Sequence, residues 1–220
     1  MDINYYITEP AKNVFSVVIN DTFNRTMVFC RTQEYYESPN PQFRGKPFSI
    51  FDYIDWYARE HDGVFTYTGD WDGFNVPYEV AFRCFCYMTP ETPYDKVMSE
   101  ILKEITLKKD HDLPAYILGV PEDSGDTFHH EVCHGLYYTN SEYKKSMDEI
   151  TNSIDIKYLE TFRDNLIEMG YIDEVVNDEV QAYLNTNWDN KSFGKGIPKK
   201  IKESLHKRYV NSLKAFHKFG

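Results

Sequence analysis

The sequence predicts an α+β fold that forms one compact unit, with a mixed, strand-rich region over residues 1–110 and a mostly helical region over residues 111–220. The chain has 220 residues, which is enough to bury a sizeable core. Its composition of 41% hydrophobic and 16% aromatic residues excludes an intrinsically disordered chain. Short apolar or alternating segments between turn residues fill the first half, whereas spacings of three and four residues dominate the second.

The first region combines predicted strands with two helices. The segment over residues 48–60 has apolar side chains at helical spacing, with Ser49 as the candidate N-cap. The segment over residues 90–109 also has apolar side chains at helical spacing, so both segments are predicted to be helices. Clusters of turn residues predict loops over residues 34–47 and 69–77. Short apolar or alternating runs predict strands over residues 14–19, 26–31, 63–68 and 80–88.

The second region is helical apart from one strand. Residues 114–120 form a short apolar run between breakers, which predicts a strand. The last helix places Ile201, Leu205 and Tyr209 on one stripe. The same periodicity predicts helices over residues 126–138, 141–153, 155–169, 171–185 and 199–218.

Charge is distributed unevenly along the chain. The formal net charge is -11, but residues 191–220 hold nine basic residues and one acidic residue, and the rest of the chain sums to -19. The acidic body argues against a nucleic-acid-binding protein. The basic tail, residues 191–220, is expected to pack on the acidic body, because the apolar stripe of its helix has to be covered. Contact of the tail with nucleic acid or an acidic membrane is the second interpretation.

The sequence lacks membrane and secretory features. No stretch approaches the roughly 18 apolar residues of a membrane span, and the first residues lack the apolar core of a secretory signal. Cys84 and Cys86 are too close in sequence for a standard zinc knuckle or for a disulfide with each other. Reduced thiols in the cytoplasm, or in the host cytoplasm for a viral protein, are therefore expected.

The most informative segment is His130-Glu131-Val132-Cys133-His134, an HExxH pattern. On a helix, His130 and His134 share a face and can bind one ion. Glu131 follows the first ligand, where its carboxylate can take a proton from a zinc-activated water. Zinc would lower the pKa of that water toward about 7. The pattern predicts a Zn²⁺ site with Glu131 as general base, and the alternative is a surface helix that holds these residues by chance.

A catalytic zinc site needs a third protein ligand. The extended pattern HExxHxxGxxH is excluded, because Tyr137 and Asn140 occupy its glycine and histidine positions, so a downstream carboxylate is expected. Glu179 is the preferred candidate. Ala182 lies one turn later on the same face, and its small side chain would let two helices approach closely. The alternatives are Glu149, Glu174 and His206, or no third protein ligand at all.

With these residues the chain resembles the gluzincin metallopeptidases, the thermolysin-like class with HExxH and a downstream glutamate, and in particular their minimal single-domain forms. It is also similar to phage and virus proteins that carry HE-x-x-HGLYY and a later DE-x-QAY. The resemblance covers about residues 113–186. It implies a zincin-like helical half, with His130, His134 and Glu179 as zinc ligands and Glu131 as the base.

The resemblance also implies how a substrate binds. In such enzymes an edge strand just before the zinc helix pairs with the extended substrate. The residues in the matching position here are Ala115, Tyr116, Ile117, Leu118 and Gly119. Thermolysin-like enzymes follow the ligand glutamate with an aspartate that orients a zinc-bound histidine, but this chain has Tyr183 at that position. Asp178 or Asp126 is the candidate for that role.

An oxyanion stabiliser completes the predicted site. Tyr183 is the candidate, and the other side chains with suitable chemistry are Tyr137, Tyr138 and His206. The features together predict zinc-dependent hydrolysis of a peptide or protein substrate. One alternative is a zinc-binding interaction protein without turnover, such as a viral or phage host factor, and another is a protein that binds no metal.

Overall fold

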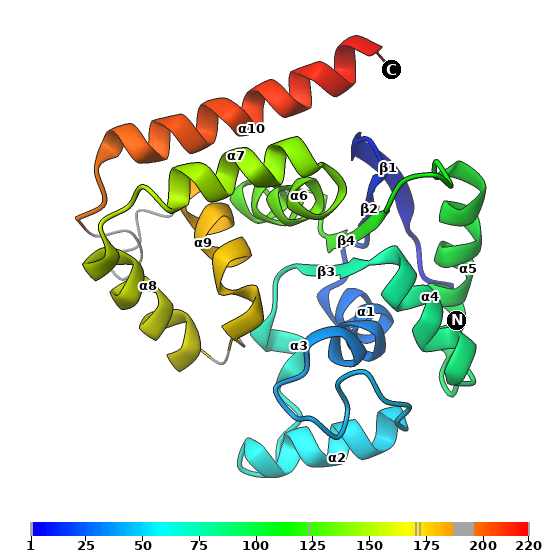
Figure 1. Cartoon of the computed structure of the whole chain (residues 1–220). Coiled ribbons are helices and arrows are strands. Elements are labelled where there is room, and N and C mark those ends of the chain that lie inside the picture. The colour runs from blue at the N-terminus through cyan, green and yellow to red at the C-terminus, as the bar shows by residue number, and fades with distance from the viewer. Residues whose placement is uncertain (1, 123, 170, 172, 187–195, 220) are drawn as a thin grey trace.

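The computed structural model describes every residue of the chain except 1, 123, 170, 172, 187–195 and 220. A four-stranded sheet lies between two groups of helices (Figure 1). Its strands are β1 (Tyr6–Ala11), β2 (Val14–Val18), β3 (Phe74–Pro77) and β4 (Tyr116–Val120), in the order β1-β2-β4-β3. The predicted α+β class is therefore confirmed. The sheet takes strands from both predicted regions, so the two regions are joined through one sheet.

β4 lies inside the sheet. It pairs in parallel with β2, with Val14 opposite Tyr116, and antiparallel with β3, with Asn75 opposite Leu118. The strand predicted over residues 114–120 is confirmed, but the prediction that it lies at an edge is wrong. A substrate strand needs unpaired backbone groups, and β4 has a partner on each side. The structure therefore contradicts the edge-strand pairing on which the substrate-binding prediction depended, which was made for Ala115, Tyr116, Ile117, Leu118 and Gly119.

The first region contains more helix than the sequence predicts. Its helices are α1 (Thr22–Glu37), α2 (Ile50–Glu60), α3 (Tyr67–Asp70), α4 (Tyr78–Tyr87) and α5 (Pro93–Lys108). The helices predicted over residues 48–60 and 90–109 are confirmed as α2 and α5. The strands predicted over residues 26–31, 63–68 and 80–88 are wrong. Those segments belong to α1, to a turn leading into α3, and to α4, because a short apolar run does not distinguish a strand from a buried helix.

Two strands were not predicted. β1 alternates weakly and contains a proline, and β3 lies inside the segment predicted as a loop over residues 69–77. β3 is an edge strand, and it ends at Pro77, a residue that sheets tolerate at their edges. β1 pairs with β2, which follows it directly in the sequence, whereas β3 is recognisable only through β4, a segment about 40 residues away.

The second region follows the prediction closely. After β4 come α6 (Asp126–Thr139), α7 (Ser141–Thr151), α8 (Ile156–Glu168), a short 3₁₀ turn η1 (Asp173–Val175), α9 (Val176–Asn185) and α10 (Lys199–Phe219). Asn140 caps α7 and Asp155 caps α8 through their side chains, which accept hydrogen bonds from first-turn backbone amides. The helices predicted over residues 126–138, 141–153, 155–169 and 199–218 are confirmed, and the one predicted over residues 171–185 is α-helical only from Val176 onward.

The two faces of the sheet bury two separate cores. Side chains alternate along a strand, so Val14 and Phe15 of β2 enter different cores, as do Tyr116 and Ile117 of β4. The core with Val14 and Tyr116 contains α6, α7, α9 and α10, and the other contains α1, α2 and α5. This arrangement explains the continuous apolar run of β4: both of its faces are buried.

α10 covers the outer side of the first of these cores. Leu205 and Tyr209 are buried, and α10 packs against α7, α9 and β1 (Figure 1). Its one ion pair among the described residues joins Lys199 to Glu203 within the helix. The described part of the tail thus packs on the body through its apolar stripe, while residues 191–195 lie outside the described residues. Among the helices that the structure describes, none has the length and hydropathy to cross a membrane.

Candidate metal centre

α6 carries the HExxH residues and lies directly on the sheet. A Cβ added to Gly135 would lie 2.5 Å from Val14 Cγ1, so glycine at this position lets the helix approach β2 closely. Val132, Cys133 and Leu136 are buried and form the side of α6 that faces the core. The helix position is therefore determined by packing, and packing fixes where its histidines point.

α9 packs beside α6 (Figure 1). This packing brings Glu179 to the two histidines. His130 Nε2 and His134 Nε2 are 3.1 Å apart, and Glu179 oxygens lie 3.4 Å from the first and 3.6 Å from the second. Ala182 is fully buried on the same face of α9, as the close approach of two helices requires. We call His130, His134 and Glu179 the metal triad.

The metal triad has the dimensions of a zinc site. Ligands about 2.0–2.1 Å from a tetrahedral ion are about 3.3–3.4 Å from one another, close to the observed separations. The side chains of His130, His134 and Glu179 are only 12%, 3% and 8% exposed. Two imidazole nitrogens that face each other at this depth repel unless a proton or a cation lies between them. The residues present therefore fit a bound divalent ion.

Asp178 holds the other side of His134. Its Oδ1 lies 3.0 Å from His134 Nδ1. An ionised carboxylate only accepts hydrogen bonds, so Nδ1 donates to it, and Nε2 is the nitrogen that faces the other two residues of the triad. Burial acts to lower the pKa of His134, but the charges of Asp178, Glu179 and Glu131 outweigh it and raise that pKa well above its usual value. Two aspartates were predicted as candidates to orient a ligand histidine. Asp178 contacts His134, whereas Asp126 is exposed in the first turn of α6.

Glu131 is held by a strand far away in the sequence. Asn75 of β3 donates a hydrogen bond from Nδ2 to Glu131 Oε2 at 2.8 Å, and the Tyr116 hydroxyl donates to Asn75 Oδ1 at 2.6 Å. A Cβ added to Gly73 would lie 2.3 Å from Glu131 Oε1. Burial raises the pKa of the Glu131 carboxyl, so its protonated form is favoured relative to water. A carboxylate that holds a proton readily suits a general base.

α1 contributes two further polar residues that sequence reasoning missed. Gln33 Oε1 accepts a hydrogen bond from the backbone amide of Asn75 at 3.2 Å, and Gln33 Nε2 donates to Glu37. Burial, followed by the negative charge of Glu179, raises the pKa of Glu37 to about 8. Asn75, Gln33 and Glu37 carry no recognisable motif. Glu37 and Asn75 lie in segments predicted as loops, and Gln33 lies just before one of them, so only the fold reveals all three.

The remaining predicted residues lie around the triad or away from it. The ring of Tyr183 is 4.6 Å from that of His130 between centroids, and its hydroxyl is 3.1 Å from the Tyr171 hydroxyl. Burial raises the pKa of Tyr183 to about 12. Its role as oxyanion stabiliser stays a prediction. Tyr137 donates to Asp148 at 2.5 Å instead, and the candidates Tyr138, Glu149 and His206 are exposed.

The side chain of the alternative ligand Glu174 lies outside the described residues. His129, the neighbour of the first triad histidine, is exposed, and its Nδ1 is 2.7 Å from the Tyr209 hydroxyl of α10. It therefore links α6 to α10 and is not part of the metal triad.

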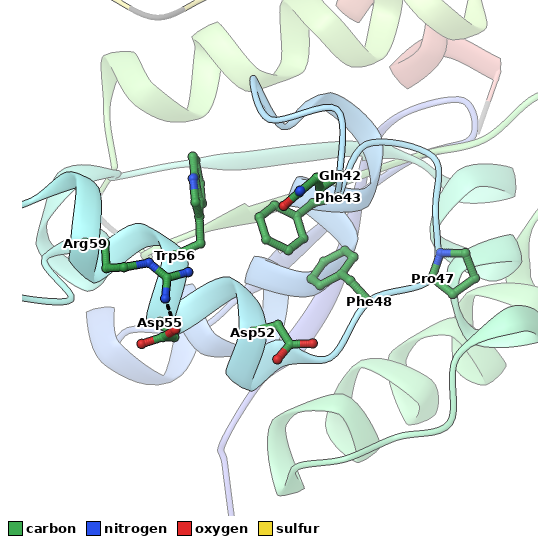
Figure 2. A pocket seen from close by; sticks show the side chains of 8 residues that line it. All are labelled: Gln42, Phe43, Pro47, Phe48, Asp52, Asp55, Trp56 and Arg59. Atoms are coloured by element: carbon green, nitrogen blue, oxygen red, sulfur yellow. Dashed lines mark hydrogen bonds and ion pairs between the residues drawn. The ribbon is translucent and has the colours of Figure 1, made fainter.

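A hollow on the surface of α2 lacks the groups of a reactive site (Figure 2). It encloses about 340 Å³, and Phe43, Phe48 and Trp56 line it together with polar side chains. Its arginine, Arg59, is already paired with Asp55. The hollow lies on α2 and the segment before it, whereas the metal triad lies on α6 and α9, so the two are separate features.

No protein-family model, curated protein or solved structure matches the chain. The gluzincin resemblance therefore depends on the motif residues alone and stays a prediction.

Proposed function

We propose that this protein is a zinc-dependent hydrolase of peptide bonds, with His130, His134 and Glu179 as zinc ligands and Glu131 as general base. The supporting observation is the convergence of Glu179 on the HExxH histidines at separations close to the edges of a zinc tetrahedron. Three protein ligands leave a fourth position for water or substrate, as in catalytic zinc sites.

Each side chain then has a defined task. A bound zinc ion would supply an acidified water and polarise the substrate carbonyl. Glu131 accepts the proton of the attacking water and passes it to the leaving amine. Asn75 holds the Glu131 carboxylate through one oxygen, which leaves the other free for proton transfer. Tyr183, packed against His130, is the proposed donor to the negative charge that develops on the carbonyl oxygen.

β3, rather than β4, offers the substrate an edge. Tyr78 donates its backbone amide to Ala115, so in the antiparallel alternation the amide of Asn75 faces away from β4. Gln33 now caps that amide. In this proposal an extended peptide displaces Gln33 and pairs with β3 next to Glu131. An intracellular setting is also proposed, because all four cysteines are free thiols.

A second candidate is a zinc-binding interaction protein without turnover, for example a viral or phage factor acting on its host. The near-complete burial of the metal triad favours it, because structural zinc sites are closed whereas catalytic ones keep an open position. Both candidates need the metal, and they differ in the role of Glu131.

Metal analysis followed by a conservative substitution tests the proposal. We expect one equivalent of zinc in protein prepared without chelators, and its loss in His130→Ala. Glu131→Gln keeps the shape of the side chain but removes the base, so zinc should stay bound while cleavage of a mixed peptide pool falls at least about 100-fold. Zinc in both proteins with no cleavage by either would favour the interaction protein, and absence of zinc from the wild type would exclude both candidates.

A further inference from the structure

A row of polar side chains supports the metal triad from behind. Asp178 Oδ1, which faces His134 Nδ1 at 3.0 Å, also accepts a 2.9 Å hydrogen bond from Gln181 Nε2. Gln181 Oε1 accepts a 3.0 Å hydrogen bond from the Tyr143 hydroxyl, and Asn185 Nδ2 donates to that hydroxyl at 3.3 Å. We call Asp178, Gln181, Tyr143 and Asn185 the polar row. It joins α7 to α9 directly behind the second ligand histidine.

The chemistry of each group fixes the direction of every bond in the polar row. A carboxylate oxygen accepts hydrogen bonds, and Gln181 presents its NH₂ group to Asp178. The Gln181 oxygen then faces Tyr143, which donates its single proton there. Because the bond to Gln181 uses the single hydroxyl proton of Tyr143, the Tyr143 oxygen accepts the hydrogen bond from Asn185. The consequence at the metal centre is that His134 also donates from Nδ1, which leaves Nε2 as the nitrogen that faces the other two residues of the metal triad.

Burial and exposure show why Asp178 needs this support. Gln181 is 0% exposed and Tyr143 and Asn185 are 3% exposed, yet the side chain of Asp178 is 23% exposed. A buried polar group that lacks a hydrogen-bond partner costs free energy of desolvation. An apolar side chain in the same place would fill the core without that cost. Asp178, by contrast, reaches solvent and could turn toward water. Gln181 is placed to prevent that rotation.

We infer that Gln181 is a positioning residue of the metal centre: through Asp178 it fixes the tautomer and direction of His134 and so raises the affinity of the triad for a divalent ion. The inference depends on the proposed zinc binding, but it concerns a residue outside the HExxH pattern and outside the ligand set. Support of this kind behind a ligand histidine changes metal affinity by about 10–100-fold.

Zinc affinity, measured by competition with a chromogenic chelator, tests the inference without reference to activity. Gln181→Leu should lower the affinity about 10–100-fold. Tyr143→Phe removes only the hydroxyl at the far side of Gln181 and should lower it in the same direction by less. Thr186→Val is the matched control, since Thr186 is a buried residue next to α9 whose hydroxyl bonds to the Ala182 carbonyl at 2.9 Å. It should leave the zinc affinity unchanged.

A double-substitution cycle separates positioning from general damage to the core. If Gln181 acts through Asp178, then adding Gln181→Leu to Asp178→Ala should cost little further affinity. An undiminished additional loss would overturn the inference, as would wild-type affinity in Gln181→Leu. Should Gln181→Leu fail to fold, as judged by thermal unfolding of the metal-free protein, Tyr143→Phe decides in its place. A wild type that binds no zinc would instead remove the proposed function itself.

Discussion

Gly73 leaves the space that the Glu131 carboxylate occupies. A Cβ at this position would lie 2.3 Å from Glu131 Oε1 and 3.0 Å from Thr127 Cγ2, distances that force a shift of the base. Gly69, four residues earlier, has no atom within 4 Å of such a Cβ. Of these two nearby glycines, only Gly73 contacts the candidate catalytic residue.

We expect Gly73→Ala to displace Glu131 while the proposed zinc ligands stay in place. Under the proposed function, peptide cleavage should fall by at least about 10-fold with zinc still bound, because the proposed base no longer points along its present direction. Gly69→Ala is the control and should change neither property. Zinc content and cleavage rate measured on the same samples check this, and equal activities in the two variants would contradict it.

Glu34 is a buried carboxyl in the other core, where Tyr67 donates a hydrogen bond to its Oε1 at 2.7 Å. Burial raises the pKa of Glu34 above its usual value, so the folded chain binds the proton more tightly than the unfolded chain does. Stability linked to this group is therefore fully present below the unfolded pKa of about 4.3 and is lost as the pH rises through the folded pKa.

Glu34→Gln should remove that pH dependence. The free energy of unfolding of the variant, relative to wild type, should rise as the pH increases from about 4 toward neutrality, because the ionised form of Glu34 destabilises only the wild-type fold. Urea unfolding at several pH values measures it. The exposed Glu60→Gln should show no such trend, and a parallel trend in both variants would argue against a buried origin.

At the level of elements, α1 shows how a cap overrides an ambiguous apolar run. Residues 26–31 read as a strand, but Asp21 accepts a 2.7 Å hydrogen bond from the Asn24 amide and starts a helix that continues to Glu37. Nearly every residue of its middle is buried, so the polar face that would mark an amphipathic helix is missing. α4 misleads for a different reason, because its exposed side also carries large apolar side chains, Phe82 and Tyr87.

Removing the cap should weaken α1. Asp21→Ala is expected to lower the free energy of unfolding by about 1 kcal/mol, because the Asn24 amide loses its partner. Asn caps as well as Asp does, so Asp21→Asn should lie close to wild type. Chemical denaturation of the three proteins gives the comparison. A large loss in Asp21→Asn would show that charge, rather than capping, is what matters.

For the whole molecule, α10 closes the core that contains the metal centre. Leu205 is fully buried there, against the same cluster as Val132 and Leu136 of α6. Leu107 of α5, in contrast, is 87% exposed. For a substitution by alanine, the relevant difference between the two leucines is therefore their burial.

Leu205→Ala should lower the free energy of unfolding by about 2–5 kcal/mol through lost burial and the cavity it leaves. Leu107→Ala should change it by less than about 0.5 kcal/mol. Thermal and chemical unfolding of the metal-free proteins provide the measurement. A small effect of Leu205→Ala would mean that α10 contributes little to this core.

Local sequence determined those features that depend on neighbours along the chain. His130 and His134 share a face because they are four residues apart on a helix, and Ala182 follows Glu179 on one face for the same reason. The amphipathic helices of the second region and the apolar stripe of α10 were predictable on the same basis, since their periodicity is written in consecutive residues.

Tertiary structure decided everything that depends on contacts between distant segments. β4 became a central strand only through β2 and β3, which lie roughly 100 and 40 residues away in the sequence, and Asn75 reaches Glu131 only because β3 joins that sheet. Glu179 was one of several suitable carboxylates until the packing of α9 on α6 selected it. The physical reason is that strand pairing and helix packing bring together residues whose separation along the chain carries no local signal.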